Sequence, residues 1–374
     1  MKVIRKEAFL PAILGLVFLL LGPVRACAVD AGSEGAYRTI TDMDGRTVRI
    51  PANIAKVLSV SPPPTTFVYM LAPEKLAGWL GAQPKGGMAY IPKGYRDKPV
   101  FNWGRGNVNV EAYLAAKPDI VFIGSESGTD PTNITILQEK FGTIPLVCVD
   151  NTRNATGYSA TLRFMGGVLG VSDRAEKLIA YYEGVLKEVK TKVDALPPEK
   201  RVRVYYAEGS NGLSTDPSGS VHSQLIDVCG GVNVASCAVN TGSGMTQVTM
   251  ESVLAWQPQV ILTTEANFAR QAPNDESWRR IPAVVNRRIY VTPSQPFNWF
   301  DRPPGVNRIV GIPWTAHVLY PELFPEDWCK RKVREFYELF YHYTLTDKEL
   351  SDLMNGSENV GNSGTGKKKS SVSQ

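Results

Sequence analysis

Two short runs combine large aromatic rings with an arginine, residues 101–105 (FNWGR) and residues 298–302 (NWFDR). Aromatic rings supply apolar contact and faces that attract cations, and a guanidinium neutralises carboxylate or catecholate oxygens. This chemistry suits a bulky, partly planar, anionic guest better than a bare metal ion. The residues that we expect to contact such a guest are Tyr90, Trp103 and Arg105 in the first half of the chain and Tyr206, Met245, Arg270, Trp299 and Arg302 in the second.

For three of these residues the sequence also bears on whether their role is structural or functional. Trp103 has packing within a lobe as its alternative, because tryptophan often serves protein cores. For Arg302 the alternative is an ion pair with Asp301 or with another carboxylate. Arg105 follows a glycine in a predicted loop, where functional side chains are common.

The histidines predict no metal site built by the protein. Direct binding of zinc or manganese usually takes several histidine and carboxylate ligands, and this chain has three histidines. His342 falls in a predicted helix and His317 in a predicted core segment, so we expect both to be structural. His222 follows the loop LSTDPSGS at 213–220 and is the only one expected near a cleft, although a lone histidine is usually ordinary.

Motifs of catalysis are missing from the sequence. The chain has no G-x-S-x-G, no H-E-x-x-H and no phosphate-binding loop. Glu208 and Asp301 are candidates for an acid–base pair, but nothing in the sequence brings them together. These observations favour a binding protein without intrinsic cofactor over an extracytoplasmic enzyme.

An internal repeat indicates how the candidate residues are positioned. Residues 110–125 (VEAYLAAKPDIVFIGS) return as residues 250–265 (MESVLAWQPQVILTTE), which aligns Glu111 with Glu251. Each copy reads as a short helix that stops before a proline and is followed by a buried strand. Strands near 57–60 and 145–149 match strands near 202–206 and 288–293 in the same order. The sequence therefore predicts two similar lobes with a ligand cleft between them.

The fold class that follows is α/β: two similar three-layer lobes with central, mostly parallel sheets, joined by one long rigid α-helix. An apolar stripe over 173–196 predicts that helix, and the hairpin at 37–51 turns at Asp44-Gly45. Because a helix resists bending, we expect only small lobe motions. The predicted segments are a signal peptide at 1–28, an N-terminal lobe at 37–155, a helical linker at 156–198, a C-terminal lobe at 199–326, a helix at 327–346 and a disordered tail at 355–374.

The first 28 residues resemble an export signal. Basic residues precede an apolar run that is too short to span a bilayer comfortably, and small residues follow at Ala26 and Ala28. Cleavage after Ala28 competes with cleavage before Cys27 and attachment of lipid to that cysteine. Removing residues 1–28, which together carry +3, lowers the formal net charge from +5 to +2, so a nucleic-acid partner is not expected. In an oxidising compartment Cys229 and Cys237 are either a disulfide or two free thiols.

The hairpin TDMDGRTVRIP at 41–51, the paired runs LAAKPDIVF and LAWQPQVIL, and the interlobe helix together resemble one family. It is the helical-backbone (class III) solute-binding proteins of ABC importers, which capture iron–siderophore complexes, haem, corrinoids and related metal chelates. The likeness covers residues 39–343. It implies a monomeric periplasmic or extracytoplasmic receptor that delivers an iron(III)–siderophore or similar metal chelate to a permease dimer and its ATPase. Corrinoid (vitamin B12), haem and a nickel or cobalt chelate are the alternatives.

The resemblance also implies roles for individual residues. Glu111 and Glu251 take the places of carboxylates that meet arginines of the permease, one on each lobe. Their alternative role is stabilisation of a helix start by the helix dipole. Corrinoid-binding members are similar at Trp103 and over 299–302, whereas Met245 stands where they carry a second-lobe tryptophan. That departure weakens the corrinoid interpretation.

Overall fold

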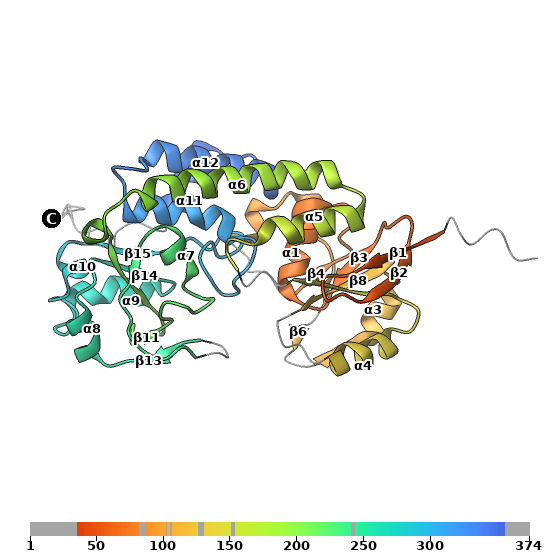
Figure 1. Ribbon diagram of the computed structural model, residues 1–374, viewed down its shortest axis with the longest axis horizontal. Helices are drawn as coiled ribbons and strands as arrows, with labels where there is room; N and C mark the ends of the chain where they lie inside the picture. Colours follow the sequence, from red (N-terminus) through yellow and green to blue (C-terminus); the bar gives the residue numbers. More distant parts are fainter. Residues whose placement is uncertain are drawn as a thin grey trace, which may run out of the picture.

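The computed structural model describes residues 36–81, 87–101, 103–104, 107–125, 131–150, 154–240 and 244–355. They form two α/β lobes, with a layer of long helices crossing one side of both lobes (Figure 1). Both central sheets are parallel, so the predicted α/β class with two lobes is confirmed. No helix among these described residues is both long and apolar enough to cross a membrane.

The first lobe is built on a three-stranded parallel sheet in the order β3-β8-β9. A hairpin precedes it, and its turn at Gly45 has a φ of 78°, where glycine carries no steric penalty. The elements of this lobe are β1 (Tyr37–Thr41), β2 (Thr47–Pro51), β3 (Val57–Ser59), α1 (Pro62–Leu71), β4 (Trp79–Leu80), η1 (Gly87–Tyr90), α2 (Lys93–Arg96), β5 (Val100–Phe101), β6 (Trp103–Gly104), β7 (Asn107–Val108), α3 (Val110–Ala116), β8 (Ile120–Ser125), α4 (Pro131–Phe141) and β9 (Leu146–Asp150).

The second lobe repeats this plan with one more strand, in the parallel order β12-β10-β14-β15. A small antiparallel pair, β11 with β13, stands beside the sheet. The elements are η2 (Pro198–Lys200), β10 (Arg203–Ala207), β11 (Ser214–Thr215), α7 (Gln224–Val228), β12 (Val232–Asn233), β13 (Thr246–Gln247), α8 (Met250–Trp256), β14 (Val260–Thr263), α9 (Ala266–Gln271), η3 (Ala272–Asn274), α10 (Pro282–Val285) and β15 (Ile289–Val291).

The repeated sequence folds the same way in both lobes. The Asn109 side chain caps α3 by accepting from Ala112 N at 3.2 Å, and Thr249 Oγ1 caps α8 by accepting from Ser252 N at 3.3 Å. Each helix ends in a left-handed residue, and a proline and a parallel strand follow. The strands also occupy equivalent places, because β3-β8-β9 matches β10-β14-β15. The predicted duplication is therefore confirmed.

The helical layer contains more helices than the sequence predicted. It consists of α5 (Tyr158–Leu169), α6 (Ser172–Asp194), α11 (Arg308–Leu319), α12 (Glu326–Phe340) and α13 (Asp347–Asn355). The long apolar stripe corresponds to α6, and the predicted final helix corresponds to α12. α11 escaped prediction because it is buried on nearly all sides and carries Pro313 inside, so it has no amphipathic period.

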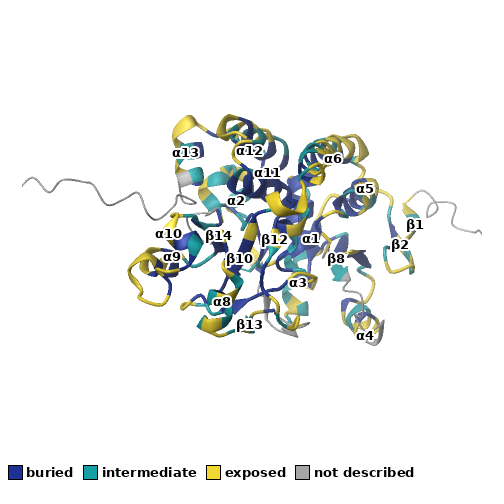
Figure 2. Ribbon diagram, turned by 60° about the vertical axis from the view of Figure 1, so that its left-hand side comes forward, coloured by how far each residue is buried: buried dark blue, intermediate teal, exposed yellow. Residues whose placement is uncertain are grey.

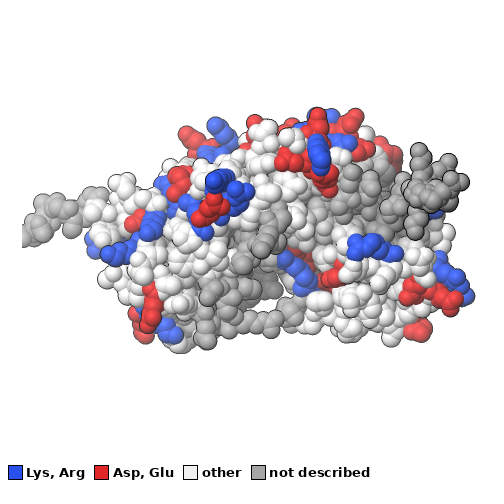
Figure 3. All heavy atoms as spheres, turned by 180° about the vertical axis from the view of Figure 1, so that it is seen from behind, with Lys and Arg blue, Asp and Glu red and all other residues white. Residues whose placement is uncertain are grey.

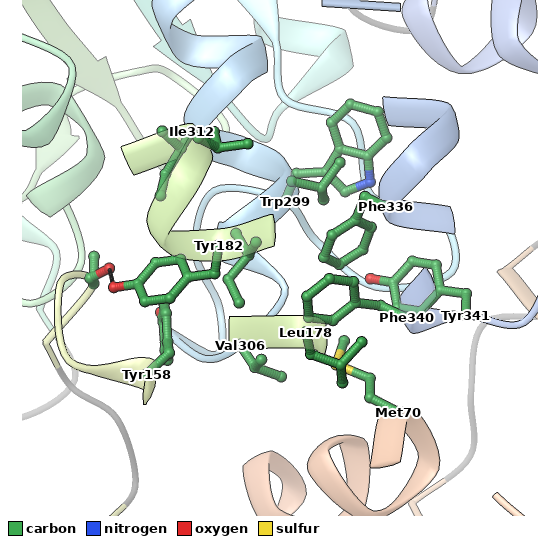
Figure 4. Packing of buried hydrophobic residues seen from close by; sticks show 14 of the residues in the cluster. Met70, Tyr158, Leu178, Tyr182, Trp299, Val306, Ile312, Phe336, Phe340 and Tyr341 are labelled. Carbon is green, nitrogen blue, oxygen red and sulfur yellow. Dashed lines mark hydrogen bonds between the residues drawn. The ribbon is translucent and has the colours of Figure 1, made fainter. Parts of the chain in front are cut away.

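One apolar core joins the lobes through this layer. Met70 of α1, Leu178 of α6 and Ile312 of α11 belong to the same buried cluster, and so do Phe336 and Phe340 of α12 (Figure 4). Figure 2 shows buried residues facing the interior and exposed residues on the outer faces of α6 and α12. A core of this kind opposes large hinge motions, as close-packed interiors do.

The cysteines of the described residues, Cys148, Cys229, Cys237 and Cys329, are free. Cys229 is buried, and its Sγ donates to Ile312 O at 3.4 Å, which supports the thiol alternative over a disulfide with Cys237. The signal segment, Cys27 and residues 356–374 lie outside the described residues. The segment limits given above stay predictions.

Candidate functional site

A buried ionic cluster lies in the second lobe where strands end. It consists of Glu208, Asp216, His222, Asp301 and Arg302, and we call it the Arg302 cluster. Glu208 directly follows β10, Asp216 directly follows β11, and Asp301 and Arg302 lie in the segment after β15. The carboxyl ends of parallel strands are the usual place for ligands in open α/β sheets.

Arg302 holds the cluster together. Its guanidinium Nε donates to Glu208 Oε1 at 2.7 Å and its Nη2 donates to Asp216 Oδ2 at 3.0 Å, while Nε lies 3.5 Å from Asp301 Oδ2. Three carboxyl groups therefore surround one arginine. The open alternative for this residue, an ion pair with Asp301 or another carboxylate, describes what the structure shows.

His222 is attached to the same cluster. Its Nδ1 lies 2.8 Å from Asp301 Oδ1, within hydrogen-bond distance. Ser220 Oγ donates to Asp216 Oδ1 at 2.8 Å on the other side. Tyr206 OH donates weakly to Asp301 Oδ2 at 3.5 Å.

The cluster has little contact with water, which alters its protonation. Glu208 is 1% exposed, and Asp216 and Asp301 are fully buried. Burial and a hydrogen bond shared with Asp216 raise the pKa of Glu208 to about 8, although Arg302 acts in the opposite direction. Glu208 Oε2 has no donor among the described residues.

Local backbone geometry fits the cluster closely. Arg302 has a φ of 51° and Met245 a φ of 62°, a left-handed region that side chains other than glycine seldom adopt. Met245 N donates to Asp216 Oδ2 at 3.3 Å. At Gly244 a Cβ would lie 2.5 Å from both Asp216 carboxylate oxygens, so only glycine lets this turn approach the carboxylate.

The segment that carries Arg302 also reaches the first lobe. Tyr158 of α5 donates to Gly305 O at 2.6 Å, and a Cβ at Gly305 would lie 3.8 Å from Pro63 at the start of α1. The buried Arg308 donates to the Tyr158 hydroxyl and to Val221 O, at 2.7 and 2.8 Å. The Arg302 cluster thus lies beside the junction of the lobes. Figure 3 shows the molecule hollowed between the lobes, with basic and acidic atoms beside the hollow.

Two predicted aromatic contacts differ from expectation. Trp299 is fully buried (Figure 4). Its Nε1 donates to Gln295 O, and its ring meets Tyr337 of α12 edge-on. A Cβ at Gly311 of α11 would lie 1.9 Å from Trp299 O, so the helix presses on this segment. Tyr206 is also fully buried and packs on Phe300. Both rings serve the core and present no free face.

The other predicted contacts are scattered. Half-buried Tyr90 packs edge-on against Tyr337 and Tyr343, and exposed Arg270 hydrogen-bonds Asn267 on α9. Met245 is exposed and adjoins the Arg302 cluster. Trp103 lies in β6 with its side chain outside the described residues, and Arg105 is outside them altogether.

Asp216 was not selected by sequence reasoning, and His222 was expected near the cleft but was not among the predicted contact residues. Together with Asp301 they are the one group of described residues that could hold a metal ion, since their ligand atoms lie within 4.8 Å of one another. Asp216 is 85 positions from Asp301 in the chain, and neither belongs to a recognised metal motif. The loop LSTDPSGS before His222 was the only local signal.

Glu111 and Glu251 are both exposed, each in the first turn of its helix. In Figures 1 and 2, α3 and α8 lie on the side of the molecule away from α6 and α12, one in each lobe. Hydrogen bonds from its own backbone N–H and from Thr249 lower the pKa of Glu251, so this carboxylate stays charged.

The family follows from comparison with known proteins. Residues 57–296 match the family model described as periplasmic binding protein. The chain belongs to this family. A solved ABC transporter solute binding protein from Sulfurospirillum deleyianum shares 30% identity with a TM-score of 0.77, over 85% of this chain and 99% of that one. The chain is thus a substrate-binding protein of the ABC transporter type.

Relatives of this chain are named for different ligands. The molybdate-binding protein MolA of Haemophilus influenzae is 24% identical over 84% of this chain and 95% of its own length. The vitamin B12-binding protein of Vibrio cholerae is 26% identical over 52% of this chain and 66% of its own length. The relatives therefore leave the ligand of this chain undecided.

Proposed function

We propose that this protein is the extracytoplasmic receptor of an ABC importer that captures an iron(III)–siderophore or a similar metal chelate between its lobes and delivers it to the membrane permease. The observation that carries the proposal is the Arg302 cluster at the lobe junction. Its carboxyl groups outnumber its arginine, so the surroundings favour a guest that brings a cation. The Arg302 side chain, 29% exposed, lies where anionic donor atoms of a chelator can meet it.

The burial of Trp299 and Tyr206 favours a metal chelate over a flat corrinoid or haem as the ligand. A flat corrinoid or haem would gain most from free aromatic faces, and these two rings offer none. Charge matching is then the main source of selectivity for a metal chelate. The mechanism is capture, small closure, docking and release, with no bond made or broken.

Titration of the mature protein tests this function by quenching of tryptophan fluorescence. The panel is a ferric siderophore, the same siderophore without iron, cyanocobalamin, haemin, a nickel–histidine complex and molybdate. We expect saturable quenching by a metal chelate, weaker binding of the iron-free siderophore and no turnover of any ligand. Quenching by molybdate alone, or chemical conversion of a ligand, would overturn the proposal.

A molybdate receptor is the second candidate. The observation in its favour is the relative MolA, which this chain matches over 95% of that protein's length. Against it stand the buried carboxyl groups of Asp216 and Asp301 beside Arg302, which disfavour a free oxyanion that brings no cation. The same titration separates the two candidates.

Docking to the permease is assigned in this proposal to Glu111 and Glu251. Each is an exposed carboxylate in the first turn of a repeated helix, one on each lobe. Two like charges arranged in this way can engage both subunits of a two-fold permease dimer at once.

A further inference from the structure

We infer that Asp216, His222 and Asp301 form a protein-held site for a first-row transition metal ion, which binds alone as a divalent ion or as the metal of an incoming chelate. This inference rests on the proposed function for the second of these forms and deepens it, because it states how the protein would hold the metal. The sequence had predicted no metal ligands, so the site is a new assignment.

The geometry of the three residues brings the right donors together. One atom from each residue lies within 4.8 Å of the others. Ligands of a tetrahedral ion at about 2.1 Å are roughly 3.4 Å apart, so the set needs to close by little more than 1 Å. One imidazole and two carboxylates, without a thiolate, suit ions such as Co²⁺, Ni²⁺ and Zn²⁺.

His222 is arranged as a metal ligand would be. It is 9% exposed, its Nδ1 is held by Asp301, and its Nε2 has no hydrogen-bond partner among the described residues. His222 Nδ1 and Asp301 Oδ1 therefore already face each other. A metal ion bound by both atoms would take the place of the hydrogen bond between them.

The charge of the cluster points to a missing cation. Asp216 and Asp301 are both buried beside a single arginine, and buried charges are stable only when paired. Glu208 Oε2, in a residue that is 1% exposed, has no hydrogen-bond partner among the described residues. A divalent ion supplies the positive charge that this side of the cluster needs.

The experiment uses the full mature chain stripped of metal with a chelator and dialysed. CoCl₂, NiCl₂ and ZnCl₂ are titrated by calorimetry, and the visible absorption of bound Co²⁺ reports its ligands. We expect one ion per chain and at least a 30-fold loss of affinity in His222→Gln. The matched control is His317→Gln, because His317 Nδ1 also bonds within the protein, to Phe324 O, far from the cluster in sequence. Equal affinities of His222→Gln and wild type would overturn the site.

A measurement on the unmodified protein covers the case in which His222→Gln does not fold. Pulsed electron paramagnetic resonance of the Cu²⁺-loaded wild type is expected to show one coordinated imidazole nitrogen. A signal without any imidazole would overturn the inference.

The two proposals fail in different ways. If ferric chelates bind equally well to wild type and to His222→Gln and no free ion binds, the metal site is wrong while the receptor function stands. Tight binding of free ion that depends on His222, with no binding of any chelate, supports the site and removes the chelate from the proposed function. Binding of molybdate alone removes both.

Discussion

At the end of β3 in the first lobe, neighbouring strands are joined by hydroxyl groups: Ser59 Oγ donates to Ser61 O, and Gly124 N donates to Ser61 Oγ at 2.7 Å. At the end of the matching strand β10 in the second lobe, Glu208 begins a buried ionic cluster. The repeated helix and strand have the same structure in both lobes, but different side chains follow the strands. We infer that features common to both lobes serve a task common to both, whereas recognition of a guest depends on the residues that differ between the lobes.

The largest expected effect tests what the lobes share. In the variant Glu111→Lys with Glu251→Lys, transport should fall to background because both permease contacts become repulsive. Ligand affinity should stay within about twofold, since neither residue belongs to the Arg302 cluster. Uptake is measured in vesicles that contain the permease and its ATPase, and affinity by fluorescence titration.

The matched control for docking is Glu199→Lys, an exposed charge reversal outside both repeated helices. It should leave transport unchanged. Normal uptake by the double variant would show that Glu111 and Glu251 only stabilise the starts of their helices.

The next effect concerns how helix α11 supports the segment of the second lobe that contains Trp299. Gly311→Ala places a methyl group against Trp299 O, and we expect a loss of about 3 kcal/mol in the free energy of unfolding, or failure to fold. Gly184→Ala in α6 is the matched control, because a Cβ there meets nothing within 4 Å. It should stabilise the protein by about 0.5–1 kcal/mol through helix propensity. Urea unfolding of both variants makes the comparison, and equal stabilities would mean that α11 does not hold Trp299 in place.

A smaller effect, measured as the dependence of stability on pH, tests the Arg302 cluster that distinguishes the second lobe from the first. The folded-state pKa of Glu208, about 8, lies above the ordinary value of 4.5 for a glutamate, so the fold keeps a proton that the unfolded chain releases between these pH values. Stability from this group is therefore full at low pH and is lost as the pH rises towards 8. Glu208→Gln keeps a neutral donor towards Asp216, and we expect it to be about 2 kcal/mol more stable than wild type at pH 8.

Unfolding by urea at pH 5 and at pH 8 measures this difference. The advantage of Glu208→Gln should shrink at pH 5, and Glu199→Gln should show no such dependence. A Glu208→Gln protein that is less stable than wild type at both pH values would mean that Glu208 is ionised in the fold.

The smallest effect asks what the first lobe contributes to binding. Trp103→Ala should weaken ligand binding at least tenfold, about 1.4 kcal/mol, because residue 103 stands between Asn102 and Gly104 in a run that combines rings with an arginine. Fluorescence titration of this variant with the best ligand of the panel gives the affinity. Unchanged affinity with an intact fold would confine recognition to the second lobe.

The scaffold was predictable because its signals are local. Asn109 and Thr249 cap their helices, and Pro118 and Pro258 follow, all within runs of a few residues. Helix α11 was missed because burial on nearly all sides removes the amphipathic period that reveals a helix.

The candidate site was only partly predictable. Arg302 was found from its neighbours in sequence, but Asp216 and His222 meet Asp301 only through tertiary packing across some 80 positions. Trp299 was selected for its type, and its type serves a core equally well. Residue composition indicates the chemistry of a site, whereas the pairing of distant carboxylates depends on the fold.

The most direct test of the account is a crystal structure of the protein with the best-binding iron chelate, measured with X-rays at the iron absorption edge. The account predicts an anomalous peak between the lobes beside Asp216 and His222, with Arg302 against the chelator. A peak away from the lobe junction, or bound chelate that leaves the Arg302 cluster untouched, would contradict it.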